Sequence, residues 1–181
     1  MIARLSTSIA RFIRKNNEQA ASEEVLMYSL TIVLNAAFIT VVVLGVSLIT
    51  GRFAAAAIML ASFVFLRFFS GGMHLPSSQL CNALSIGSFV VLLHLPVDYW
   101  NTGFALNLIA LILVAVLAPT NDMMQLNLLG PKFAILFKFV SIALVTSNFW
   151  IQSPAMSLAL CSQAVSLTPI AYKAVALLER R

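Results

Sequence analysis

The sequence predicts an all-α, polytopic integral membrane protein with about six transmembrane helices behind an N-terminal interfacial amphipathic helix. Of its 181 residues, 61% are hydrophobic and only 9% are charged, and the mean hydropathy is +0.98. A soluble domain of this length needs more charge on its surface to stay in solution. Apolar runs of the length that crosses a bilayer, about 20 helical residues, recur between polar or Pro/Gly breaks. We therefore expect lipid to solvate most of this chain.

Residues 1–20 differ in kind from the rest of the chain. On a helix, Ile2, Leu5, Ile9, Phe12 and Ile13 share one face, and the basic residues gather on the other. This pattern is typical of a helix that lies in the membrane interface and contacts lipids. A cleaved signal peptide is the alternative, but arginines interrupt the stretch and it has no continuous apolar core.

The apolar runs follow in order along the chain. They cover approximately residues 28–50, 53–69, 80–95, 102–118, 133–149 and 155–178. The second, third and fourth runs are short, which favours a thinned bilayer or a partly buried helix at those positions. No internal repeat divides the chain, so we expect one integral membrane domain over residues 1–181, with the interfacial helix over 1–20 and the transmembrane helical bundle over 28–178.

The basic residues predict an orientation. With the N-terminus inside, six crossings place ten of the eleven Lys and Arg residues, all but Arg52, on or near the cytoplasmic side. This arrangement follows the positive-inside rule. We expect a multi-pass protein of the cell membrane with both termini and the loops at 70–78 and 119–132 in the cytoplasm, and with no nucleic-acid partner.

Residues 67–81, RFFSGGMHLPSSQLC, place polar chemistry between two apolar runs. Gly71, Gly72 and Pro76 should end the helix that begins at residue 53, because glycine permits irregular backbone and proline cannot continue a helix. A new helix can start at residues 76–78 with a serine as N-cap. Cys81 then falls in its first turn or just after it, where free N–H groups and the helix dipole favour a thiolate.

His74 lies seven residues before Cys81. On a continuous helix the two would be roughly 10 Å apart, but the Gly/Pro break lets the imidazole fold back and act as general base to the thiol. Arg67 favours a functional interpretation, since an arginine near the membrane is costly unless paired; it could orient a carboxylate or stabilise an oxyanion. The alternative is a packing histidine and a cap contact. Two donors do not make a closed zinc site, so no metal or cofactor is expected.

The second cysteine has a different setting. Cys161 lies within the last apolar run, and two cysteines are too few for a disulfide framework. We expect two free thiols, with Cys161 acting as a small packing residue that its hydrophobic surroundings keep inert. His94, near the outer face, is assigned no role.

The set Arg67, Gly71-Gly72, His74, Ser78 and Cys81 resembles the signature of the accessory gene regulator B (AgrB) family of bacterial quorum-sensing membrane endopeptidases. The catalytic histidine and cysteine of that family have the same seven-residue separation.

Two further segments are similar to family features. Ala118-Pro119, followed by a polar loop to Pro131-Lys132, resembles the loop between the middle transmembrane segments, and SLTPIAYK at 166–173 resembles the closing segment. One departure concerns that loop: TNDMMQLNLLGPK carries Lys132 as its only basic residue, where family members often have several.

The resemblance implies a cysteine endopeptidase that cuts an AgrD-like precursor peptide near its C-terminus and promotes cyclisation to a thiolactone or lactone. Cys81 would be the nucleophile and His74 the general base and then acid. Arg67, Gly72 and Ser78 would support them. Lys132 would contact the substrate, and the protein would be a homodimer without a cofactor.

Two other classes of protein remain open. A peptide permease or exporter without protease activity would use the polar break as a re-entrant pore element, but the apolar runs lack carboxylates and the chain shows no inverted repeat. A structural membrane subunit would have no use for a reactive Cys/His loop.

Overall fold

The structure, a computed structural model, describes residues 2–17, 19–73, 77–120 and 132–179. All regular elements in these ranges are helices, which confirms the predicted all-α class. The helices are α1 (Ile2–Asn16), α2 (Glu23–Ile49), α3 (Phe53–Ser70), α4 (Ser78–His94), α5 (Phe104–Leu117), α7 (Lys132–Ile151), α8 (Pro154–Val165) and α9 (Pro169–Glu179), with a short π-helix η1 (Tyr99–Gly103) ahead of α5.

The bounds of α3, α4, α5 and α7 agree with the predicted apolar runs to within a few residues. Helix α2 begins five residues before its predicted apolar run. The run misses the first turn of the helix because that turn is polar. Ser22 is the N-cap, and its Oγ accepts a hydrogen bond from the Val25 N–H at 3.4 Å. Glu23 and Glu24 follow in the first turn, where acidic side chains are favoured by the helix dipole.

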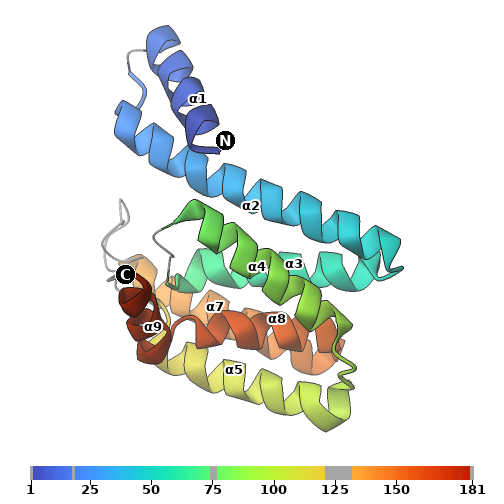
Figure 1. The fold of residues 1–181 in the computed structure, drawn as a ribbon. Coiled ribbons are helices and arrows are strands. Elements are labelled where there is room, and N and C mark those ends of the chain that lie inside the picture. The colour runs from blue at the N-terminus through green and yellow to red at the C-terminus, as the bar shows by residue number, and fades with distance from the viewer. Residues whose placement is uncertain (1, 18, 74–76, 121–131, 180–181) are drawn as a thin grey trace.

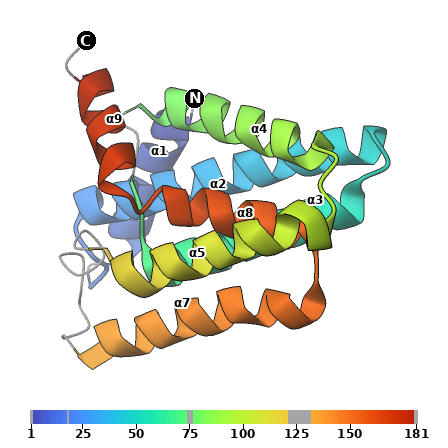
Figure 2. The same ribbon diagram turned by 90° about the horizontal axis from the view of Figure 1, so that it is seen from below.

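Helix α8 runs through the middle of the bundle (Figures 1 and 2). It contacts α3, α4, α5 and α7, and seven of its twelve residues are buried. One hydrophobic cluster joins α8 to α5, α7 and the end of α3, and a second joins it to α2, α4 and the start of α3. Successive helices return across the bundle, so the end of α3, the start of α4 and α9 share one end of the molecule (Figure 1).

The predicted single run over residues 155–178 is two helices. Helices α8 and α9 meet at a bend of 67°. Pro169 begins α9 and disfavours helical geometry at the residue before it. The hydroxyl of Thr168 accepts the Ala171 N–H at 3.3 Å and so caps the new helix. An apolar pattern continues through such a bend, which is why the sequence suggested one segment.

Four helical segments of the described chain are long and apolar enough to cross a membrane. They are Glu23–Ile49, Phe53–Ser70, Tyr99–Leu117 and Phe133–Ile151. The bent pair α8–α9 passes the same criterion as a fifth span, and α4 is apolar but shorter. The helices therefore fit a membrane protein, while the expected count of six crossings stays a prediction.

Helix α1 folds back against the first half of α2 (Figure 1). Its small residues Ser6 and Ala10 are fully buried, and the Thr31 hydroxyl donates to Ser6 Oγ at 2.9 Å. Small residues allow such close helix contact. Phe12, on the apolar face expected from the sequence, is 69% exposed. The placement of this face in the membrane interface stays a prediction.

Candidate functional site

Arg67 lies in the last turn of α3 and holds the chain that leaves this helix. Its guanidinium Nη2 donates to the Met73 carbonyl at 2.6 Å, and Nη1 donates to Gln163 Oε1 at 3.4 Å. The Gly71 N–H donates to the Arg67 carbonyl at 2.9 Å and closes the helix. One arginine thus joins the end of α3, the turn after it and the central helix α8.

Helix α3 ends at Ser70, at the glycine pair where the sequence predicted a break, and the turn that follows depends on both glycines. Gly71 has φ +77° and Gly72 has φ +134°, a region that side chains with a Cβ rarely adopt. A Cβ on Gly72 would lie 2.7 Å from Ser166 Oγ and 3.2 Å from Gln163 Nε2. Both conformation and space therefore require glycine at position 72.

Gln163 and Ser166, at the C-terminal end of α8, bind this turn, and neither was predicted as a site residue. Gln163 Nε2 donates to the Gly71 carbonyl at 2.6 Å and to Ser70 Oγ at 3.2 Å. The Ser166 carbonyl accepts the Met73 N–H at 3.3 Å. The available signal was a glutamine inside an apolar run, since polar groups in membrane helices are functional candidates.

The chain that follows α5 docks on the same turn. The Thr120 N–H donates to the Ser70 carbonyl at 3.0 Å, directly after the Ala118-Pro119 pair. Three segments far apart in sequence therefore meet where α3 ends.

Cys81 lies at the end of the first turn of α4. Ser77 is the N-cap and accepts the Leu80 N–H at 3.5 Å, Ser78 is the first helical residue, and the Cys81 N–H donates to the Ser77 carbonyl at 2.9 Å. The predicted serine cap is therefore confirmed. The Cys81 thiol is free and half-buried.

The cysteine, the arginine and α9 lie close together. Cys81 and Tyr172 both lie near enough to Arg67 to interact with its guanidinium electrostatically. The start of α4 is also fixed to α2, because the Asn82 amide donates to Asn35 Oδ1 at 3.0 Å. A cation and a free thiol thus share one end of the bundle.

Three other residues considered in the sequence do not join this cluster in the described structure. His74 lies outside the described residues, so its pairing with Cys81 stays a prediction. Lys132 is the first residue of α7, and its side chain is outside the description. Cys161 is a free, half-buried thiol in the middle of α8.

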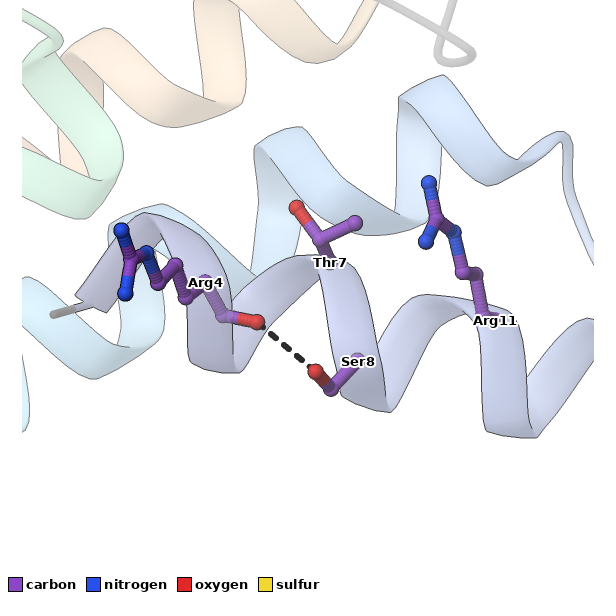
Figure 3. A pocket seen from close by; sticks show the side chains of 4 residues that line it. All are labelled: Arg4, Thr7, Ser8 and Arg11. Atoms are coloured by element: carbon purple, nitrogen blue, oxygen red, sulfur yellow. Dashed lines mark hydrogen bonds between the residues drawn. The ribbon is translucent and has the colours of Figure 1, made fainter.

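A second region of interest is on α1. Arg4, Thr7, Ser8 and Arg11 line an open depression of about 420 Å³ on the helix surface (Figure 3). Arg11 also pairs with Glu23 of α2 at 2.9 Å. Within the described residues no three His, Cys, Asp or Glu side chains gather as a metal ion would require.

The fold and the site together define the class of this protein. It is a helical protein whose apolar helices fit a membrane. A glycine turn follows one of its helices, and a cysteine lies at the start of the next. The chain matches the family model described as Accessory gene regulator B over residues 6–170. It therefore belongs to the AgrB family, a membrane family, and the expected resemblance is confirmed.

One relative is a protein of Halalkalibacterium halodurans that is named AgrB-like. The two are 36% identical over 87 residues, which cover 48% of this chain and 44% of that protein. The match thus spans less than half the length of the relative. No solved structure matches the chain.

Proposed function

We propose that this chain is a multi-pass cysteine endopeptidase of the cell membrane that cleaves an AgrD-like precursor peptide and promotes its cyclisation to a signalling thiolactone or lactone for quorum sensing. Membership of the AgrB family suggests peptide processing. The observation that carries the proposal is the position of Cys81, in the first turn of α4 and within electrostatic reach of Arg67.

The chemistry begins with deprotonation of the thiol. His74 takes the proton from Cys81, and the thiolate attacks the carbonyl carbon of the scissile peptide bond. As the tetrahedral adduct collapses, the C–N bond breaks and His74 returns the proton to the leaving amine. The N-terminal part of the precursor stays on Cys81 as a thioester.

The peptide ring closes in the same step that releases Cys81 from the thioester. A cysteine thiol or serine hydroxyl within the bound peptide attacks the thioester carbonyl and loses its proton to His74. The new thiolactone or lactone bond forms while the bond to Cys81 breaks. Water gives linear product instead, and a half-buried thiol limits that competition.

Arg67 supplies positive charge to this site. The guanidinium is within electrostatic reach of Cys81 and donates hydrogen bonds to the Met73 carbonyl and to Gln163 Oε1. A fixed cation favours the oxyanion that forms when the scissile carbonyl is attacked. Met73 directly precedes His74 in the sequence, so the same contact fixes the residue before the proposed base.

The proposal includes an orientation. The end of the bundle with Arg67, Cys81 and α9 would face the cytoplasm, where a newly made precursor reaches it. Lys132 would contact the substrate, α1 would rest on membrane lipids, and the active form would be a homodimer.

Cleavage of a co-expressed precursor tests the proposal. Cys81→Ala and Cys81→Ser should abolish cleavage, since a serine hydroxyl is hardly ionised and one histidine removes its proton poorly. His74→Ala should lose the roughly 10²- to 10⁴-fold that general base catalysis supplies. Cys161→Ala is the matched control, a second half-buried free thiol, and should still cut.

Cleavage that survives in Cys81→Ala at normal protein level would contradict the proposal. The permease without protease activity would then be the better description of this chain.

A further inference from the structure

We propose that Gln163 is a positioning residue of this site, whose buried amide fixes the Arg67 guanidinium against the Gly71 carbonyl and so sets the place of the cation beside the cysteine-bearing end of α4. The inference rests on the proposed function for its catalytic meaning. Gln163 comes from α8, 96 residues after Arg67. The central helix would thus contribute to the site without touching the substrate.

The amide of Gln163 has both of its donors in use and one acceptor site on the arginine. Nε2 donates to the Gly71 carbonyl and to Ser70 Oγ, while Oε1 accepts from Arg67 Nη1. The single hydroxyl proton of Ser166 lies closer to the Gln163 main-chain carbonyl, at an O–O distance of 2.7 Å, than to Oε1 at 3.2 Å. Gln163 is 0% exposed, and water does not compete for these contacts.

Only one orientation of this amide fits. The guanidinium can only donate and the Gly71 carbonyl can only accept, so Oε1 must face Arg67 and Nε2 must face Gly71. The amide therefore bridges the guanidinium and the Gly71 carbonyl, with one of its ends on each group. An apolar residue of equal size would leave the buried Gly71 carbonyl without this donor and would remove the Gln163 acceptor from guanidinium Nη1.

A second buried amide provides the comparison that separates positioning from general stability. Asn148 of α7 is also 0% exposed; it donates to Asn107 Oδ1 and Ser157 Oγ, and accepts the Ser153 N–H at 3.0 Å. These contacts join α5, α7 and the start of α8, away from the Gly71 turn. Loss of Asn148 should destabilise the bundle without a specific link to Arg67.

The first test is a double-mutant cycle on kcat/KM for precursor cleavage by the purified full-length protein in detergent. Gln163→Met and Arg67→Met should each lower kcat/KM, by roughly 10²-fold as expected for a misplaced catalytic environment. The double variant should be no worse than Arg67→Met alone, because Gln163 acts through Arg67. Asn148→Leu should instead combine with Arg67→Met multiplicatively.

A second readout does not require peptidase activity. In a Cys161→Ala background, the rate of Cys81 alkylation by iodoacetamide at neutral pH reports the reactivity of that thiol. Gln163→Met should slow alkylation by the same factor as Arg67→Met, and the two together should slow it no further. If Gln163→Met does not accumulate, Gln163→Asn keeps an amide but shortens its reach by one methylene, and the same non-additivity is expected.

The outcomes are distinguishable. If the losses from Gln163 and Arg67 multiply in both readouts while Cys81→Ala remains inactive, the positioning role is wrong and the proposed function stands. If Cys81→Ala still cleaves, the proposed function is wrong, and the alkylation cycle alone decides whether Gln163 acts on Cys81 through Arg67.

Discussion

Gly72 occupies a backbone conformation and a space that both require glycine. Its φ is +134°, and a Cβ added to it would lie 2.7 Å from Ser166 Oγ. Both features result from the docking of the turn on α8. The conformation is a consequence of long-range hydrogen bonds by Gln163 and Ser166 rather than of local sequence. The glycine pair alone predicts a break; the requirement for glycine at position 72 follows from the packing.

Gly72→Ala should therefore destabilise the protein by about 1–3 kcal/mol, the usual cost of a strained backbone position, and should strongly reduce precursor cleavage. Gly87→Ala is the matched control. Gly87 lies inside α4 with no atom within 4 Å of an added Cβ, so alanine there should be neutral or stabilising by about 0.5–1 kcal/mol. Thermal unfolding in detergent measures both, and equal stability of the two variants would contradict the strain at Gly72.

Arg67→Lys should impair cleavage although it preserves the charge. The guanidinium binds two acceptors in different directions, the Met73 carbonyl and Gln163 Oε1, and a lysine ammonium lacks that fork. We expect roughly a tenfold or greater loss of kcat/KM. Arg52→Lys is the control, because one Arg52 nitrogen donates to the Leu93 carbonyl at 2.8 Å and lysine can supply a single donor. Full activity of Arg67→Lys would show that charge alone suffices.

Helix α1 contacts α2 through one set of residues and exposes another set to its surroundings. Ser6 and Ala10 are buried, whereas Leu5 and Phe12 are 49% and 69% exposed. The basic residues that line the depression in Figure 3 lie on the same short helix. This division is typical of a helix that packs on its own protein and also rests on a membrane.

Replacing Ile9 and Phe12 by Asp should weaken membrane docking or precursor processing, because charge on the apolar face opposes interfacial binding. Asn17→Asp adds one such charge at an exposed polar position just beyond α1 and should have little effect. Vesicle flotation of an α1 peptide and precursor cleavage by the full chain measure the two consequences. Unchanged results for the double variant would leave the interfacial role without support.

The helices and the site differ in how far the sequence predicts them. Apolar runs locate α3, α4, α5 and α7 well, because bilayer-facing helices must be apolar over their whole length. The bend between α8 and α9 was missed, although Thr168 and Pro169 mark it, since hydropathy does not change across it. The serine cap and Cys81 position were predicted from local rules. Gln163 was not, because its partners lie more than ninety residues away in the sequence.

The proposed orientation of the whole molecule places the two ends of the bundle on opposite sides of the membrane. Reagents that cannot cross the membrane should therefore reach only one end. Gln79, exposed in the first turn of α4, and Trp100, 66% exposed in η1, mark the two ends. In a cysteine-free background, Gln79→Cys should react only with reagents that enter the cytoplasm, and Trp100→Cys should react from outside. Labelling of position 79 from outside would reverse the proposed orientation. Position 72 is unsuitable for such a probe because its turn requires glycine.

The central claim is that Cys81 forms an acyl-enzyme, and trapping that species tests it most directly. A precursor whose internal cysteine or serine is replaced by alanine cannot close the ring, so the thioester should persist until water hydrolyses it. Rapid acid quench followed by mass spectrometry of the digested protein should find the N-terminal part of the precursor on the peptide that contains Cys81, and no adduct on Cys161. Precursor cleavage without any adduct on Cys81, or an adduct on Cys161 instead, would contradict the account.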